Sequence, residues 1–417
     1  MSRSPLIALV LATLLSGSLT PALGYSGGSG TPADPYQIAI PADWQQLMAT
    51  PTHWNKHFIL TADLTLAGLT LTPVGNSTTK FTGTFDGQDH IISNATINLP
   101  NNEHVGLFGY LDTGAIISNL GVTGGKIAGG RHVGGLAGYN NAGVITACYA
   151  ASPLSGLLSV GGLVGCNCGT VAACYATGAV TAACDAGGLA GRNWHGAIAA
   201  CYATGAVRGW SVPPPIGYVG GLGGLVGYSY YDTITASYAT GSVTGSFFPL
   251  IISGGLVGDT DNGTITECFW DRQTSAQPFS AGGTPKSTSE MKTLSTFTSA
   301  GWDFIGENDP TGDWIMLPND YPKLVWQPRA VPALRGLTLL QAQSVLSTAG
   351  FSLGESYLRL RHVPRPRSDL RLSSQVWNPC LSAIDRSSPP TRQEHQILSR
   401  RRNFFRPLPN RHTRRLA

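Results

Sequence analysis

Two histidines near the start of the sequence have the spacing of a metal-binding pair. In His53-Trp54-Asn55-Lys56-His57 the two side chains are four residues apart, as they are in helical zinc peptidase motifs. Such a peptidase needs a glutamate directly after the first histidine to act as general base, but Trp54 stands there. We therefore interpret this segment as surface or cap and predict no zinc site.

Four acidic residues come closest to the carboxylate pair of a glycoside hydrolase. That chemistry needs two carboxyl groups about 5–10 Å apart, and Asp259 and Asp261 are followed by Glu267 and Asp271. The run Asp261-Asn262-Gly263-Thr264 is also typical of a turn, because Asp and Asn favour turns. We favour the turn and predict no catalytic residue, metal ligand or cofactor.

The cysteines offer a third kind of chemistry. Cys166-Asn167-Cys168 lacks a second pair to complete a zinc site, and we interpret it as a variant of Tyr139-Asn140 and Tyr228-Ser229. Four other cysteines occupy equivalent positions of a repeat, in which Ser237 replaces cysteine. That exchange favours a ladder of packed thiols, although an even count of eight in an exported chain leaves disulfide bonds open.

A six-fold repeat positions these residues. A Gly-Leu-small-Gly box begins at Gly106, Gly135, Gly162, Gly188, Gly224 and Gly255, and a second box, best seen in Cys174–Gly178, follows each first box by 12 or 13 residues. A period of this length indicates a solenoid, propeller or array. The predicted core of the repeat consists of Leu107, Leu136, Leu163, Leu189, Leu225, Leu256, Cys148, Cys174, Cys201 and Cys268.

We predict an all-β chain folded as a right-handed parallel β-helix of about six coils. One repeat divides into three short strands and three corners, for example Gly161–Gly165, Val171–Ala176 and a strand opening at Gly178–Val180. Right-handedness follows the rule for parallel strand connections. The glycines of each box are expected at corners and at close approaches of the backbone.

The second box also carries an aromatic ladder, which is our candidate binding surface. Strand alternation places its rings opposite the cysteines, so an inward cysteine ladder means an outward aromatic one. Outward rings would offer apolar faces and hydroxyls to a sugar chain or a protein; inward rings would be core. The ladder consists of Tyr149, Tyr175, Tyr202, Tyr238 and Phe269.

The rest of the chain divides by composition. Residues 1–24 read as a secretory signal peptide, with Arg3, an apolar run and a small-residue cleavage site. We expect an N-terminal cap and first coils over 25–105, with a short helix at Ala42–Met48, the repeat array over 106–271 and a C-terminal cap over 272–327. Three consecutive prolines in Trp210–Pro215 indicate a loop bulging from one corner.

Charge separates the end of the sequence from the remainder. Residues 356–417 hold 14 arginines against 3 acidic residues, whereas the first 355 residues carry a net charge of −7. An out-of-frame segment, a functional polybasic tail and ordinary disorder all fit this tail. We expect no specific nucleic-acid partner, and no apolar run after the signal is long enough to cross a membrane.

The GLFG, GLAG and GLVG boxes with the Cys-Tyr-Ala-Thr-Gly strand resemble the GLUG-motif repeats of bacterial secreted and surface proteins. The resemblance covers about residues 100–272. Such repeats also occur beside the catalytic domain of immunoglobulin-A-cleaving metallopeptidases. The resemblance implies a secreted or cell-surface β-solenoid tied to adhesion or the envelope, and no catalytic activity of its own.

A second resemblance covers residues 328–355. Val331-Pro332-Ala333-Leu334-Arg335-Gly336-Leu337, a predicted helix over Leu339–Ala349 and Gly350-Phe351-Ser352-Leu353-Gly354 are similar to the first half of a PASTA module. The second half of that family's pattern is absent here. The resemblance implies binding of peptidoglycan fragments, so the expected partners are cell-wall polysaccharide, peptidoglycan or surface proteins. A β-helix polysaccharide lyase or hydrolase remains the enzymatic alternative.

Overall fold

The computed structural model describes residues 24–210, 220–245, 252–305, 312–327, 333–334, 337–348, 352–353 and 376–377. The chain divides into two compact units, residues 1–328 and 329–417. The predicted signal peptide up to residue 23, the proline-rich loop after Trp210 and all of the basic tail except 376–377 lie outside the described residues.

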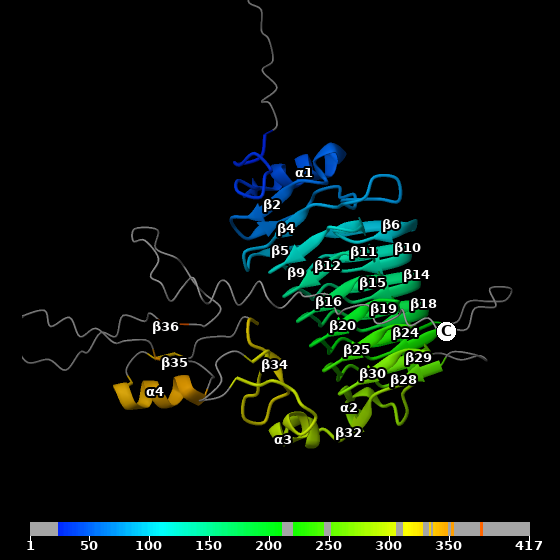
Figure 1. The fold of residues 1–417 in the computed structure, drawn as a ribbon, viewed down its shortest axis with the longest axis vertical. Coiled ribbons are helices and arrows are strands. Elements are labelled where there is room, and N and C mark those ends of the chain that lie inside the picture. Colours follow the sequence, from blue (N-terminus) through cyan, green and yellow to red (C-terminus); the bar gives the residue numbers. More distant parts are fainter. Residues whose placement is uncertain are drawn as a thin grey trace, which may run out of the picture. The chain divides into compact units, whose positions relative to one another are not determined.

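The first unit is a parallel β-solenoid, which confirms the predicted fold class. Short strands stack in register into four long sheets, and every strand pair within these sheets is parallel (Figure 1). Low charge and abundant β-forming residues favour such strands, and the short polar corners between them let the chain turn at each coil.

We name the four sheets A to D. Sheet A stacks β1 (Tyr36–Ile38), β2 (His57–Leu60), β4 (Thr84–Asp86), β8 (Ile116–Ser118), β12 (Val144–Thr146), β16 (Thr170–Ala172), β20 (Ala197–Ala199), β25 (Thr233–Thr235) and β30 (Thr264–Thr266). Sheet B stacks β3 (Leu64–Thr65), β5 (Ile91–Ser93), β9 (Gly121–Thr123), β13 (Tyr149–Ala150), β17 (Tyr175–Ala176), β21 (Tyr202–Ala203), β26 (Tyr238–Ala239), β31 (Phe269–Asp271) and β32 (Thr284–Lys286). Sheet C stacks β7 (Phe108–Leu111), β11 (Ala137–Asn140), β15 (Val164–Asn167), β19 (Ala190–Trp194), β24 (Val226–Tyr230) and β29 (Val257–Asp261). Sheet D contains β6 (Thr96–Val105), β10 (Lys126–Gly134), β14 (Leu154–Gly161), β18 (Val180–Gly187), β22 (Val207–Gly209), β23 (Gly221–Gly223), β27 (Val243–Gly245) and β28 (Ile252–Gly254).

The coils of the repeat array draw on four sheets, so the predicted three-strand coil is wrong. In one complete coil the chain passes through β14, β15, β16 and β17 before it returns to sheet D at β18. The predicted strand over Val171–Ala176 is split into β16 and β17 because Ala173 adopts a left-handed conformation with φ of 50°. Alanine rarely adopts this conformation, so the sequence contains no local signal for the corner.

The box leucines lie inside the solenoid, at corners. The repeat pattern predicts Leu163 at the centre of a strand, but this residue stands between the end of β14 and the start of β15, fully buried. The box glycines bring neighbouring coils together: a Cβ on Gly162 would lie 2.1 Å from the carbonyl oxygen of Gly188. The predicted close approach of the backbone therefore accounts for these glycines.

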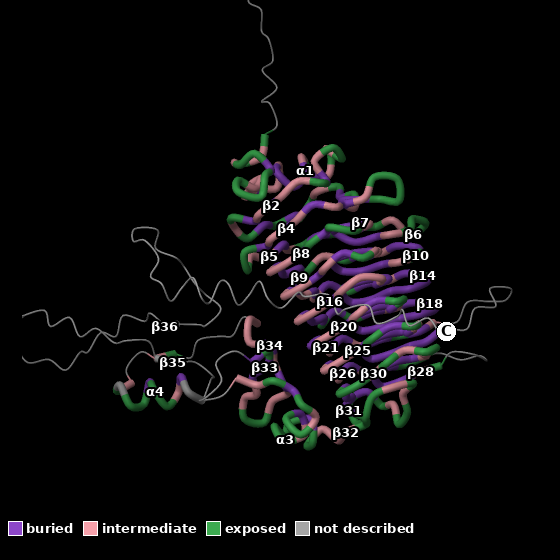
Figure 2. The backbone as a smooth tube through the Cα atoms, viewed as in Figure 1, coloured by how far each residue is buried: buried purple, intermediate pink, exposed green. Residues whose placement is uncertain are grey.

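Buried residues, coloured purple in Figure 2, follow one another along the solenoid and form its core. At its N-terminal end, α1 (Pro41–Ala49) forms where a helix was predicted, and Trp44 packs edge-on against Phe85 and Phe108. A single turn, η1 (Pro51–His53), follows α1. The segment that follows supplies β2 and β3 to two different sheets.

The segment after β31 turns back along the solenoid. It contains α2 (Arg272–Ser275), β32, η2 (Glu290–Lys292), α3 (Leu294–Thr298) and the antiparallel pair β33 (Trp314–Ile315) and β34 (Lys323–Leu324). We call residues 290–305 and 312–327 the strap, because their aromatic side chains pack on the outside of sheet B.

The second unit contributes one helix, α4 (Leu339–Thr348), where a helix was predicted, and the antiparallel pair β35 (Ser352–Leu353) and β36 (Val376–Trp377). Gln341 donates its backbone N–H to the Thr338 hydroxyl at the start of α4. Within the described residues, none of the helices has the length and apolarity needed to cross a bilayer.

Candidate functional site

The predicted aromatic ladder exists and lies outside the solenoid core. Successive rings of Tyr149, Tyr175, Tyr202 and Tyr238 stack almost parallel, with centroids 4.8 to 5.0 Å apart, and Phe269 follows Tyr238 in register. The cysteines that directly precede these strands belong to the core inside the solenoid. The geometry is therefore that of a regular column of rings on one outer face.

This ladder is covered by the strap, which rules it out as a solvent-exposed binding surface. Tyr175, Tyr202, Tyr238 and Phe269 are all buried, and only Tyr149 is half-buried. The Tyr202 hydroxyl donates to Gln327 Oε1 at 2.6 Å. From the sequence pattern we expect this segment to cap the end of the solenoid. The pattern does not predict that the strap lies along its side. The rings that cover the ladder belong to Phe297, Trp302, Trp314, Tyr321 and Trp326.

The cysteine ladder consists of buried thiols that hydrogen-bond to the backbone. Cys174 Sγ donates to the carbonyl of Ala172 at 3.1 Å and accepts the N–H of Cys148 at 3.4 Å. Ser237 repeats this pattern, donating to Thr235 at 2.7 Å and accepting the N–H of Cys201 at 3.0 Å. Cys148, Cys174, Cys201 and Cys268 form no disulfide bond, so their role is structural.

The groups that suggested metal or acid–base chemistry do not converge. His53 and His57 contact Tyr25 and Thr84, respectively. Asp271 is fully buried, where its carboxylate accepts hydrogen bonds from Thr288 and Tyr321. No metal-binding group of three His, Cys, Asp or Glu side chains occurs in the part of the chain that the structure describes.

A different set of aromatic side chains is exposed at the corner between sheets C and A. Trp194 and Tyr230 are paired residues of β19 and β24, and their rings stack at 4.1 Å. His195 and Tyr231, the next residues in each coil, stack at 5.7 Å. Trp194 is 37% exposed and Tyr231 is 52% exposed. We call Trp194, His195, Tyr230 and Tyr231 the aromatic platform.

Buried asparagines hold the corner beneath this platform. Asn140 Nδ2 donates to Asn167 Oδ1, and Asn167 Nδ2 donates to Asn193 Oδ1, both at 2.8 Å. The next coil ends this ladder with Ser229, whose hydroxyl donates to Asp232 at 2.6 Å. Burial raises the pKa of Asp232 to about 6, against the opposing effect of its hydrogen bonds from Ser229 and Asn193. The ladder fixes the backbone from which the platform side chains project.

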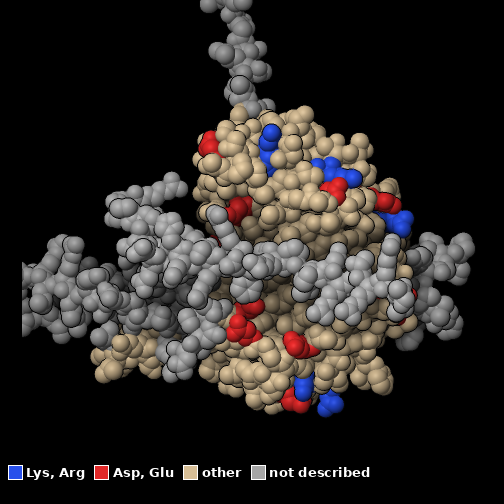
Figure 3. Space-filling view, viewed as in Figure 1, with Lys and Arg blue, Asp and Glu red and all other residues tan. Residues whose placement is uncertain are grey.

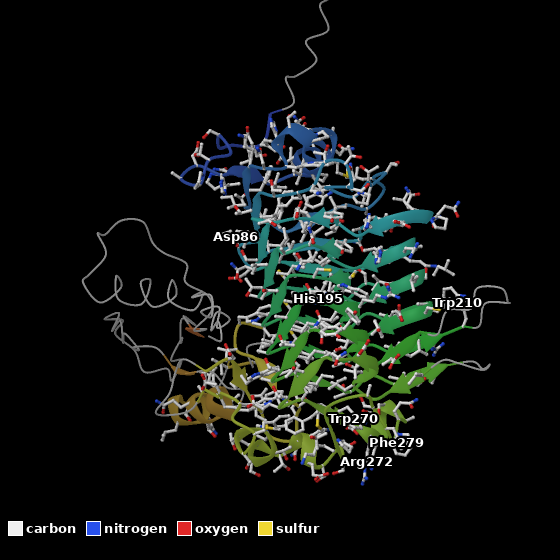
Figure 4. The ribbon with its side chains drawn as sticks, turned by 45° about the vertical axis from the view of Figure 1, so that its right-hand side comes forward. Asp86, His195, Trp210, Trp270, Arg272 and Phe279 are labelled. Carbon is white, nitrogen blue, oxygen red and sulfur yellow. The ribbon has the colours of Figure 1, made fainter. Side chains whose placement is uncertain are left out.

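An open hollow of about 390 Å³ lies beside the platform. It runs across neighbouring coils, and His195 and Tyr231 belong to its wall. Figure 4 shows His195 on the side of the stacked coils, well away from Phe279 near their C-terminal end. The hollow is lined by Ala142, Cys168, Gly169, Thr170, His195, Gly196, Ala197, Tyr231, Asp232 and Thr233.

Cys168 is the one cysteine among the residues that line this hollow. It follows Cys166, which pairs with Tyr139 as the alignment of the repeats predicts. The Tyr139 hydroxyl lies 3.2 Å from Cys168 Sγ. Hydrogen bonding from Cys166, together with that from Tyr139, lowers the pKa of the Cys168 thiol to about 7 although burial opposes the shift. The thiol is half-buried, and a lowered pKa favours alkylation because the thiolate is the nucleophile.

The sequence carries a signal for the platform that the predicted aromatic ladder did not include. Tyr139-Asn140, Cys166-Asn167 and Tyr228-Ser229 occupy equivalent positions in their coils. Side chains two residues further along a strand lie on the same face, and Trp194 and Tyr230 occupy those positions. Aromatic residues there in two consecutive coils indicate an exposed platform.

Comparison with known proteins identifies the repeat. The family model described as "The GLUG motif" matches residues 182–208 and 218–244. The chain therefore carries GLUG repeats in tandem, as the resemblance predicted. The match gives no support to the PASTA-like segment, which stays a prediction.

Two curated relatives share part of the chain. A 150-residue stretch is 35% identical to halomucin of Haloquadratum walsbyi and covers 33% of this chain and 2% of halomucin. A 75-residue stretch is 41% identical to the "Putative Gly-rich membrane protein" of Evansella cellulosilytica and covers 16% of this chain and 8% of that protein. The chain thus spans only a small part of either relative's length.

A solved structure has the same fold. The crystal structure of a "putative immunoglobulin A1 protease" from Bacteroides ovatus is similar with a TM-score of 0.52 and 22% sequence identity. The match covers 73% of this chain and 96% of the other. At this identity the likeness shows a shared β-solenoid fold.

Proposed function

We propose that this GLUG-repeat β-solenoid is a secreted or cell-surface, non-enzymatic scaffold or adhesin that binds extracellular or cell-envelope polymers or proteins. The observation that carries the proposal is the aromatic platform: exposed, stacked rings on a rigid corner, beside a hollow of about 390 Å³. Aromatic rings left in contact with water are enriched where proteins meet their partners.

The relatives support the location. One relative is named halomucin, and the other is described as a Gly-rich membrane protein. Both names agree with a protein that works outside the cytoplasm. The predicted signal peptide agrees with this address. A solenoid suits a scaffold because each coil rests on its neighbours and the outer faces stay regular over its length.

The carboxylates of the enzymatic alternative lie in β29 and make local hydrogen bonds. Asp259 accepts the N–H of Thr260 at 2.9 Å, and Asp261 accepts a side-chain hydrogen bond from Asn262. Both residues lie in register with the platform strand, Asp259 beside Tyr228 and Asp261 beside Tyr230. We therefore assign them to the rim of a binding surface.

Co-sedimentation of the full chain with insoluble peptidoglycan, cell-wall polysaccharide and whole envelopes, repeated from low to high salt, tests this function. We expect salt-resistant binding to at least one of these materials, because aromatic contacts are screened little by ions. Binding that vanishes at moderate salt would indicate a charge-driven contact of the arginine-rich tail. Absence of binding to all three would refute the proposed polymer-binding role.

A further inference from the structure

The hollow beside the aromatic platform has the chemistry of a site for an uncharged, hydroxyl-rich molecule. His195 and Tyr231 supply aromatic surface, and Thr170 and Thr233 supply hydroxyl groups from the outer side of sheet A. Neither Lys nor Arg lines it. Its one acidic residue, Asp232, is buried and accepts a hydrogen bond from Ser229.

The charges around the platform disfavour an anionic ligand. Asp261 continues the column of Trp194 and Tyr230 along sheet C, and it is exposed. Arg192, the nearest cation in sheet C, is paired with the buried carboxylate of Asp185. On the uncovered part of the face drawn in Figure 3, acidic and basic side chains lie in small, separate groups among uncharged residues. An acidic polymer would meet carboxylates here without a compensating cation.

The strands at this corner disfavour an extended peptide. In sheet C, β19 pairs with β15 on one side and β24 on the other. In sheet A, β20 is likewise paired with β16 and β25. Recognition by strand addition needs an open sheet edge, and the platform lies in the middle of both sheets. No open strand edge is therefore available to the ligand at this corner.

We propose that the aromatic platform and its hollow bind a neutral glycan. The apolar face of one pyranose ring packs on Tyr231 and His195, with its hydroxyls toward Thr170 and Thr233. The next sugar units of the glycan pack over Trp194 and Tyr230. At the rim, Asp261 accepts hydrogen bonds from sugar hydroxyls. This inference rests on the proposed function and names its ligand class.

Affinity electrophoresis of the full chain through gels containing soluble neutral polysaccharides tests the site. The probes are dextran, laminarin, glycogen, hydroxyethyl cellulose and galactomannan, with alginate and polygalacturonate as acidic comparisons. We expect retardation by at least one neutral probe, a tenfold or greater loss of affinity in Trp194→Ala/Tyr231→Ala, and no change in Phe279→Ala. Phe279 is the matched control, because it is an aromatic residue 78% exposed near the far end of the solenoid.

Alkylation of Cys168 places the ligand. The thiol lines the hollow and its pKa is lowered to about 7, so iodoacetamide modification followed by mass spectrometry reports access to it. We expect the retarding polysaccharide to slow modification of Cys168 at least threefold in the wild type and to have no effect on the rate in Trp194→Ala/Tyr231→Ala.

The outcomes separate this inference from the scaffold role. Retardation by no neutral probe, stronger retardation by the acidic probes, or full binding by a correctly folded Trp194→Ala/Tyr231→Ala variant would overturn the glycan site. If that variant still co-sediments with envelopes, the scaffold role stands and its ligand lies elsewhere. If the wild type is retarded by a glycan but sediments with no envelope material, the glycan site stands and the scaffold role fails.

Discussion

The indole Nε1 of Trp326 donates a hydrogen bond to the carbonyl oxygen of Ala173 at 3.0 Å, although 153 residues separate them. The same indole lies over Tyr149 and Tyr175, with ring centroids 6.4 and 5.7 Å away. The strap thus returns from the end of the solenoid to coils near the start of the repeats.

Replacing Trp326 with alanine should loosen the strap and lower stability by about 2 kcal/mol, because a half-buried indole loses its packing and its hydrogen bond. We expect faster proteolysis within residues 290–327 and greater accessibility of Tyr149 to iodination. Urea unfolding and limited proteolysis measure both effects, with Phe279→Ala as control. Unchanged proteolysis would show that the strap is held without Trp326.

The cysteine ladder predicts that serine replaces cysteine better than valine does. Cys174→Ser keeps a donor for Ala172 and an acceptor for the N–H of Cys148, as Ser237 does in its own coil. Cys174→Val leaves that buried N–H without a partner, which costs about 2 kcal/mol more. Urea unfolding of the two variants gives the comparison. A valine variant as stable as the serine variant would mean that the thiols act by packing alone.

The asparagine ladder predicts that a substitution in its middle lowers the stability of the protein more than a substitution at its end. Asn167 bonds to Asn140 on one side and to Asn193 on the other, whereas Asn140 Oδ1 has no partner among the described residues. Asn167→Ala should therefore destabilise the protein by about 1 to 2 kcal/mol more than Asn140→Ala. Thermal unfolding of both variants tests this order, and equal losses would contradict a continuous ladder.

Asp232 predicts a specific dependence of stability on pH. Its pKa is raised to about 6 in the fold, above the ordinary value of about 3.9 in an unfolded chain. The stabilisation that this shift provides is complete below pH 4 and is lost as the pH rises through 6. Asp232→Asn should remove this dependence, so between pH 4 and pH 7 the difference in stability between the two proteins should move in favour of the variant by about 3 kcal/mol.

Melting temperatures of the wild type and Asp232→Asn between pH 4 and 7 measure the effect. The difference between the two proteins isolates Asp232 from the other titrating groups. Asp34→Asn, which removes a carboxylate at an exposed position, is the matched control. A constant difference between the wild type and Asp232→Asn across this range would contradict the buried carboxylate.

The repeat made the solenoid predictable, because equivalent boxes must stack in equivalent places. Leu163 and Gly162 indicated a buried position and a close approach, and Cys174 and Tyr175 indicated opposite faces. The corner at Ala173 was not predictable, since alanine carries no preference for its left-handed conformation.

The covering of the ladder was not predictable for a different reason. Nothing local in Tyr202 or Tyr238 reports that Gln327 or Pro322 will accept a hydrogen bond from the hydroxyl. The aromatic residues of the strap are visible in the sequence, but their partners depend on the path of the chain in space. The aromatic platform was predictable in part. Strand alternation places Trp194 and Tyr230 on the outside of the solenoid.

A stack of coils that touch only their neighbours behaves like a one-dimensional chain of spins, and such a chain melts from its free ends. The strap breaks this description. The strap connects the last coils to Ala173 and Tyr149. It therefore couples the stabilities of coils that a nearest-neighbour description treats as independent. Unfolding from the C-terminal end must first release Trp326, so the repeats melt in a single cooperative event. A force applied to the chain after residue 327 acts on the strap before it acts on any coil.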